Sequence, residues 1–538
     1  MKIAAFALAA LAALTLAGCS QKGVRAPCPS GKVCLEAGNG SDPVSLDPHK
    51  ITGTWEDRID GDMFIGLTQS DIAGNVIPGM AQTWETSPDG LTWTFHLRDA
   101  KWSDGAPVTA DDFVFSLRRI MTPETAAEYA SLLYFIKGAQ PVNEGKAAPD
   151  TLGVRAIDAH TLEIRLEHPA PYLLELAKHQ TMYPVPRHVV EKYGMKWTEP
   201  ANIVVNGPYK VVSWKLGDKI VAEKNPLFWD ASQLCIDRVT YYASQDPVAA
   251  ERQVKRGELD MQSSITANRV AFLRRPGNMP EFIHLNTYLG VTYLFFNGSS
   301  PQFRDKRVRQ ALSMAIDRDF LTKGIMMGSG GETAYTFVPP GVANYSPAAK
   351  PEWASWPLER RQQEARRLLA EAGYGPDHPL TFEVKHRGLE ASAFMATVQS
   401  DWRQVGVKAK LIGSESQVAY QAYRTRDFDM GDGGWIADYN DAVSFLALMQ
   451  SQTGSMNYGD YKNPRYDELL AKADNEPDAV KRAEFLRQAE AMVLDDTPVI
   501  PIYFLINSNL VSPRVTGFVD NITDQHRTRY MCFKDAKR

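Results

Sequence analysis

The sequence predicts an α/β protein with two lobes that are joined by a hinge. Apolar residues recur at period two in some segments and at helical spacing in others, so strands and helices mix along the whole chain. Extended apolar segments at 288–297 (YLGVTYLFFN) and 498–507 (PVIPIYFLIN) enclose a domain-sized stretch. Two such crossings favour two lobes around a hinge. The alternative is that both segments are core strands of one large sheet.

Individual elements follow from the same periodicities. Residues 91–97 and 162–166 alternate between apolar and polar side chains, which predicts two half-buried strands. Residues 308–320 and 358–372 carry apolar side chains at helical spacing, and Gly373 is placed to end the second helix.

Length and composition indicate a globular, multidomain chain. The 538 residues correspond to about three or four domains, and 44% hydrophobic with 23% charged residues is ordinary for a soluble protein. A chain of this size buries a core that needs no metal or disulfide to hold it. The net charge of −5 argues against a nucleic-acid or anionic-membrane binder, because both need a basic face.

The N-terminus has the features of a secretion signal. Met1 and Lys2 precede an apolar stretch at 3–14, and the sequence LAGC that ends at Cys19 resembles a bacterial lipoprotein box. That resemblance implies a signal peptide at 1–18, lipid on Cys19 and a tether at 19–32. The alternative is an ordinary leader with a chance cysteine. Since no later segment has about 18 consecutive apolar residues, we expect an exported protein that is held to a membrane only by its N-terminus.

The four remaining cysteines predict two disulfides in an oxidising compartment. Four cysteines allow three sets of pairs. Cys28 and Cys34 flank the small loop 29–33, so we expect the pairs Cys28–Cys34 and Cys235–Cys532. A metal site is the weaker alternative, because the spacing is not C-x2-C and no histidine lies beside these residues.

Several long motifs carry a family resemblance. Residues 84–113 read WETSPDGLTWTFHLRDAKWSDGAPVTADDF, and further matching stretches are GSDPVSLDPHK at 40–50, NGPY at 206–209, RGELD at 256–260, FRDKRVRQALSMAIDR at 303–318 and GWIADYN at 434–440. They strongly resemble the extracellular solute-binding proteins of ABC importers, family 5, and in particular its oligopeptide-binding members. The likeness runs from about residue 33 to the C-terminus.

The resemblance implies a periplasmic-binding-protein fold. This fold is type II-like, of the three-subdomain peptide-binding variety, with a ligand cleft between the lobes. The domains that it implies are lobe I at 33–285 with a subdomain inserted at about 65–190, lobe II at 286–499, and a C-terminal return to lobe I at 500–538.

The same resemblance implies a ligand site around GWIADYN. In the oligopeptide-binding relatives the aspartate of this motif binds the α-ammonium of the peptide, which assigns that role to Asp438. Gly434 and Ile436 would offer backbone groups to an added peptide strand, and Trp435 would wall a side-chain pocket. The alternative for Asp438 is a helix cap or a turn, and for Trp435 it is a core role.

Lobe I is expected to contribute from two places. Tyr129 matches a family tyrosine near the N-terminus of the peptide, with a core role as its alternative. Thr52, Gly53 and Thr54 match the lobe I strand that pairs with the peptide from its other side.

This sequence also departs from the relatives. Asp432 and Met326, and approximately Ala391, occupy places where the relatives have basic residues that hold the C-terminal carboxylate of the peptide. Recognition of that end is therefore in doubt, although Arg424, Arg426 and His386 are nearby basic residues that we list as substitutes. A cysteine pair that some relatives carry near the hinge and the motif is missing too.

Together these features predict a lipid-anchored, monomeric receptor of the bacterial cell envelope that captures oligopeptides and delivers them to an ABC permease, with no cofactor and no catalysis. Within the family, the alternatives are a cell-wall peptide, a dipeptide, haem or a nickel complex, although the ten histidines form no metal-ligand cluster. Outside it, a peptide-binding chaperone or adhesin remains open. An exported hydrolase has no support, because HExxH, GxSxG and GxxxxGK[ST] are absent from the sequence.

Overall fold

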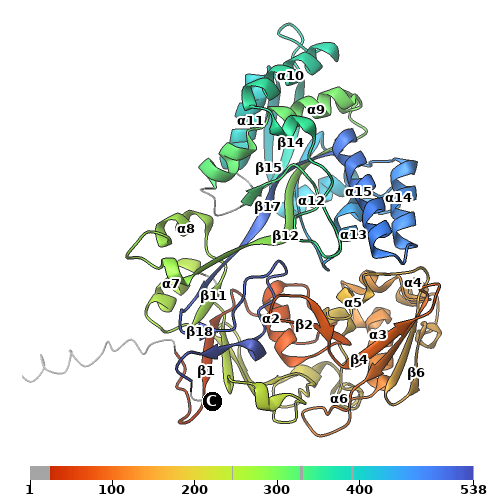
Figure 1. The fold of residues 1–538 in the computed structure, drawn as a ribbon, viewed down its shortest axis with the longest axis vertical. Coiled ribbons are helices and arrows are strands. Elements are labelled where there is room, and N and C mark those ends of the chain that lie inside the picture. Colours follow the sequence, from red (N-terminus) through yellow and green to blue (C-terminus); the bar gives the residue numbers. More distant parts are fainter. Residues whose placement is uncertain (1–24, 245, 327–330, 389–392, 537–538) are drawn as a thin grey trace, which may run out of the picture.

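The protein folds into two lobes that are connected by a pair of long strands (Figure 1). A computed structural model describes residues 25–244, 246–326, 331–388 and 393–536. The predicted signal peptide and Cys19 lie outside these residues. Lobe I occupies the lower part of the view and holds most of the first half of the chain, and lobe II lies above it.

Lobe I is built on one half of the large sheet. Its strands, in the order of hydrogen bonding away from the crossing strands, are β11 (Met261–Ser263), β1 (Cys34–Gly38), β10 (Arg238–Tyr242), β9 (Lys219–Lys224) and β8 (Tyr209–Lys215). Its helices outside the insert are α2 (Thr54–Met63), α7 (Pro247–Lys255) and α8 (Ala267–Leu273). All five residues of β1 are buried, as expected for a strand with a neighbour on each side.

The predicted insert contains its own four-stranded antiparallel sheet. The strands are β4 (Ala81–Thr86), β5 (Thr92–Leu97), β7 (Thr161–Arg165) and β6 (Val154–Asp158), and the short strands β2 (Thr68–Ser70) and β3 (Val76–Pro78) precede them. The helices are α3 (Ala110–Met121), α4 (Ala139–Asn143), α5 (Leu173–Leu176) and α6 (Arg187–Tyr193). β5 and β7 are the two strands that the alternating patterns predict, and their buried side chains join the core of lobe I.

Lobe II is the other half of the large sheet with helices on both faces. Its strands are β15 (Lys408–Ser414), β14 (Thr381–Arg387), β16 (Met430–Ile436) and the short β13 (Gly331–Thr333). Its helices are α9 (Lys306–Ala315), α10 (Leu358–Glu371), α11 (Ala393–Gln404), α12 (Ser416–Thr425), α13 (Val443–Leu446), α14 (Pro464–Asp474) and α15 (Ala479–Asp496). Separate hydrophobic cores lie on its two faces.

One helix prediction in lobe II is too long. The helix predicted to reach residue 320 ends at Ala315, because Ile316 is extended. Asp317 then accepts a hydrogen bond from the amide of Phe320 at 3.0 Å and starts a separate turn, which leaves Phe320 exposed. The helix at 358–372 agrees with α10, and Gly373 follows it with a φ of 91°.

The two apolar segments do cross between the lobes. They form β12 (Ile283–Phe296) and β17 (Val499–Val511), which pair with each other in an antiparallel ladder. The register shifts between Thr287 and Val291, where the strands pass from one lobe to the other. The alternative interpretation is confirmed, because β12 and β17 are core strands of one sheet that runs through both lobes. Movement of the lobes about these strands stays a prediction.

The chain returns to lobe I after β17. Strands β18 (Val515–Thr516) and β19 (Cys532–Phe533) pair with each other, and their apolar side chains join the core of lobe I. The structure contains the disulfides Cys28–Cys34 and Cys235–Cys532, which are the pairs expected from the sequence. Across the ranges that the structure describes, no helix is long and apolar enough to cross a membrane, and no group of acidic, histidine or cysteine side chains is arranged to hold a metal ion.

Candidate functional site

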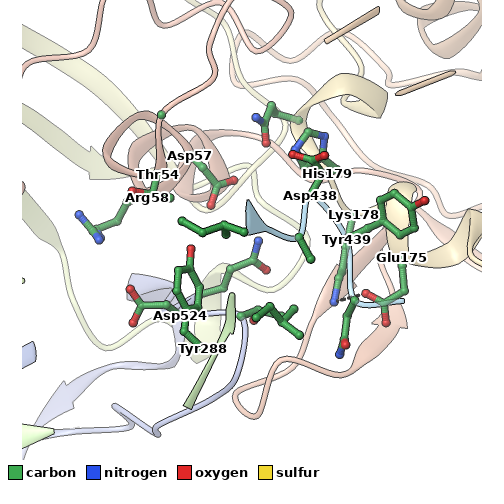
Figure 2. Close-up of a pocket in the computed structure, with 18 of the residues that line it drawn as sticks. Thr54, Asp57, Arg58, Glu175, Lys178, His179, Tyr288, Asp438, Tyr439 and Asp524 are labelled. Carbon is green, nitrogen blue, oxygen red and sulfur yellow. Dashed lines mark ion pairs between the residues drawn. The ribbon is translucent and has the colours of Figure 1, made fainter. Parts of the chain in front are cut away.

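A cavity of about 1100 Å³, part of it open to solvent, lies where the two lobes meet (Figure 2). Lobe I, its insert and its C-terminal return supply residues 52–54, 57–58, 129, 175, 178–180 and 523–527, while the hinge and lobe II supply 288–289 and 436–440. Six of the eight predicted ligand residues line it: Thr52, Gly53, Thr54, Tyr129, Ile436 and Asp438.

The lobe I wall is the start of α2 and the extended segment that precedes it. Gly53 is the N-cap of α2, and the carboxylate of Glu56 accepts the amides of Gly53 at 2.9 Å and Thr52 at 3.1 Å. This is a capping box that satisfies amides at the helix start. Thr54 is already the first helical residue. The amides of Thr52 and Gly53 are occupied by Glu56, and pairing of 52–54 with a peptide strand stays a prediction.

Asp438 is a carboxylate in the cavity with a strongly raised pKa. The hydroxyl of Tyr129 approaches its carboxylate across the lobe boundary. Burial raises the pKa of Asp438 to about 6, and the nearby hydroxyl of Tyr129 lowers it only in part. Burial and the nearby carboxylate raise the pKa of Tyr129 to about 12. Asp438 thus combines a desolvated carboxylate with a neutral donor.

The other carboxylates of the cavity have partners of their own. Arg527 donates to both oxygens of Asp57 at 3.0 Å, and Lys178 contacts Glu175 at 2.8 Å, the ion pair dashed in Figure 2. Asp524 contacts the imidazole of His526 at 2.9 Å. Among the described residues that line the cavity, Asp438 is the carboxylate without a basic partner.

His179 does not supply the missing positive charge. It lines the same cavity, and its ring packs edge-on against Tyr129 with 5.8 Å between centroids. Burial lowers the pKa of His179 to about 4, so the ring is neutral at physiological pH. Asp438 is therefore left for a cation that comes from outside the protein.

The strand that leads to Asp438 has a free edge. β16 pairs with β12 along its length, but with β14 only at Met430 and Gly431. From residue 432 to 436, its other edge meets no strand within the part of the chain that the structure describes. Ala437 donates its amide to Leu289 of β12 at 2.8 Å. Because strand residues alternate in the side to which their backbone groups point, Gly434 and Ile436 direct theirs away from β12.

The remaining two predicted residues, Gly434 and Trp435, lie outside the cavity. Gly434 is exposed at the open edge, and a Cβ built there would meet nothing closer than 3.8 Å. Trp435 is half-buried, packs on the core of lobe II and donates its indole N–H to Ser444 at 3.4 Å. A pocket wall at Trp435 stays a prediction.

Two of the three basic residues suggested by the sequence, His386 and Arg426, have other surroundings. His386 is buried on one face of β14, and Arg426 forms an ion pair with Asp460 at 2.7 Å. Arg387 is the residue that sequence reasoning missed, although it follows His386 directly. The alternation of β14 puts it on the other face, with its guanidinium 3.8 Å from the Cβ position of Gly434. Ala391 lies outside the described residues.

The residues that follow Asp438 hold the lobes together. The ring of Tyr439 stacks on Tyr172 of lobe I with 5.0 Å between centroids. The backbone of Asn440 approaches the carboxylate of Glu175 and lowers its pKa, against the larger rise that burial causes. The loop that carries Asp438 is therefore fixed on both sides of the cavity.

Comparison with known proteins identifies the family. A model of the bacterial extracellular solute-binding proteins, family 5 Middle, matches residues 75–457. The chain belongs to this family. Its sequence is 39% identical to the periplasmic oligopeptide-binding protein OppA of Escherichia coli over 96% of this chain and 95% of that one.

Solved structures of family 5 proteins share the two-lobed fold. The unliganded open form of the periplasmic murein tripeptide binding protein MppA superposes with a TM-score of 0.83 at 34% identity, covering 94% of this chain and 98% of that one. Haemophilus influenzae OppA in complex with the peptide RPPGFSPFR gives 0.76 at 34% identity, covering 94% and 99%.

Proposed function

We propose that this family 5 solute-binding protein captures peptides in the cavity between its lobes and holds the peptide α-ammonium on Asp438. The observation that carries the proposal is the half-buried carboxylate of Asp438, which lines the cavity and has no basic partner among the described residues. An ammonium group of the ligand would supply that charge, and removal of water around such a pair strengthens it.

The open edge of β16 favours a peptide, rather than another positively charged molecule, as the ligand. Gly434 and Ile436 present backbone groups to the outside, and both residues are exposed. A peptide added as a further strand would use its main chain, which is common to all sequences, and its terminal charge would set the register.

The relatives support a role in import. The similar proteins are named periplasmic oligopeptide-binding and murein peptide-binding proteins, and solved relatives are titled as parts of oligopeptide ABC transporters. We therefore infer delivery of the ligand to an ABC permease in the cell envelope by a monomer that performs no catalysis.

Mass spectrometry of the ligands released from gently purified protein tests this function. We expect short peptides with free N-termini and varied side chains, because the proposed contacts use the main chain and the ammonium. A relative that is 35% identical is named for binding deoxycholate. Recovery of a bile acid, haem or a metal chelate in place of peptides would contradict the proposal.

We also propose that the protein is anchored by lipid on Cys19. The support is the sequence LAGC before Ser20 at the end of an apolar leader. We expect that cells which express the protein incorporate labelled palmitate into it, and that Cys19→Ser abolishes the label and releases the protein from the membrane fraction. Label that persists in Cys19→Ser would contradict the anchor, and Cys28→Ser is the control that should keep it.

A further inference from the structure

Arg387 and Asp432 form a closed ion pair at the far end of the open edge of β16. The guanidinium donates to Oδ2 of Asp432 from Nε at 3.0 Å and from Nη2 at 2.8 Å. The amide of Arg387 donates to Oδ1 at 2.8 Å, and Tyr423 donates to the same oxygen at 2.9 Å. Tyr420 takes a further bond from Nη1 at 2.9 Å. Hydrogen bonds with the backbone and with two tyrosines therefore fix the orientation of both side chains.

This pair lies where the end of a bound peptide is expected. Gly434, beside the guanidinium, is four residues before Asp438, which corresponds to about 14 Å of extended chain at about 3.4 Å per residue. A peptide whose ammonium is on Asp438 and which follows the edge of β16 would bring its fourth residue to Arg387. The side chains of Arg387 and Asp432 are 27% and 13% exposed, so the pair is partly accessible from solvent.

We propose that Asp432 neutralises the charge of Arg387, so that peptides with and without a charged C-terminus bind with similar affinity. The inference rests on the proposed function and adds the rule by which ligands are selected. A carboxylate that approaches the guanidinium also approaches the carboxylate of Asp432, so attraction and repulsion largely cancel. Selection then depends on the ammonium at Asp438, and peptides longer than four residues or with a blocked C-terminus are accepted as well as free tetrapeptides.

Calorimetry with a tetrapeptide and its C-terminal amide tests the rule. In the native protein, we expect the two dissociation constants to agree within about threefold. Asp432→Asn keeps an oxygen for the amide of Arg387 but cannot neutralise the guanidinium. A freed guanidinium makes charge-assisted hydrogen bonds to a carboxylate, so we expect this variant to bind the free acid roughly ten- to hundredfold more tightly than the amide.

Two further variants keep the test decisive. Arg387→Met leaves Asp432 as an unbalanced charge, so the free acid is expected to bind several-fold more weakly than the amide. Asp427→Asn is the control, because Asp427 is exposed and pairs with Lys385 away from Gly434; it should behave like the native protein.

The possible failures are distinguishable. A native protein that prefers the free acid by tenfold or more, or a folded Asp432→Asn protein that shows no preference, would overturn this inference alone. A native protein that binds neither tetrapeptide would contradict the proposed function itself.

Discussion

Asp438→Asn is expected to weaken peptide binding by roughly a hundred- to several-thousand-fold while the fold stays intact. The substitution keeps the size of the side chain and an oxygen for the hydroxyl of Tyr129, but leaves the buried ammonium of the peptide without a countercharge. Loss of one partner of a buried pair costs about 3–5 kcal/mol, and about 1.4 kcal/mol corresponds to tenfold in affinity. Isothermal titration calorimetry with a free peptide measures the loss.

N-acetylation of the peptide provides the matched change on the ligand. The acetylated peptide is expected to lose a similar amount against the native protein and little more against Asp438→Asn, because both changes remove the same pair. Equal affinities of free and acetylated peptide for the native protein would show that Asp438 does not bind the ammonium.

The pH dependence of affinity follows from the same carboxylate. Burial raises the pKa of Asp438 to about 6 in the unliganded protein, so the charged form that binds an ammonium is present above pH 6 and is lost as the pH falls. Affinity should drop about tenfold per pH unit below this value, and should drop again above pH 8, where a peptide amine with a pKa of about 8 loses its proton. The acidic limb should be absent in Asp438→Asn.

Arg527→Met is expected to lower the free energy of unfolding of lobe I by about 3–5 kcal/mol. Its guanidinium is buried between the C-terminal return and α2, where it donates to the carboxylate and to the backbone oxygen of Asp57. Nearby acidic groups raise the pKa of Arg527, so it is charged throughout the stability range. Without it the carboxylate of Asp57 stays partly buried and unpaired. Urea unfolding monitored by circular dichroism measures the change.

The double variant Asp57→Leu/Arg527→Met separates the pair from packing. Removing both charges should restore part of the stability lost in Arg527→Met, because no lone charge is left. Arg256→Met is a control in the same lobe, since Arg256 contacts Glu258 at an exposed site and surface pairs of this kind contribute little. A double variant that is less stable than Arg527→Met would contradict this account.

Much of the architecture could be predicted because its signals are local. The alternation in 91–97 predicts β5, and helical spacing with Gly373 predicts α10. The two long apolar segments predict the hinge strands β12 and β17. Their pairing with each other into one sheet was left open, because periodicity within a segment carries no information on which strand lies beside it.

The site was predictable only in part for a similar reason. The motif at 434–440 indicates Asp438, and the alternation of β16 agrees with the outward backbone of Gly434 and Ile436. The choice of His386 over Arg387 depended on which face of β14 meets the core, which a single strand does not reveal. The segment 52–54 was assigned to a strand from the family resemblance, whereas the local bond between the amide of Gly53 and the carboxylate of Glu56 starts helix α2 at Thr54.

The return of the chain to lobe I has a consequence for the order of folding during synthesis. Helix α2 is among the first elements made, yet Asp62 on it accepts the amide of Thr528 at 3.0 Å and Gly61 leaves the space that the guanidinium of Arg527 fills. Domains usually fold in the order in which they emerge. Lobe I is the first lobe to be synthesised but the last to complete its fold. Its hydrophobic core includes side chains from the segment 511–533, which is synthesised at the end of the chain. Until then, lobe II can complete its own core, and the nascent lobe I remains a partner for chaperones and a target for proteases.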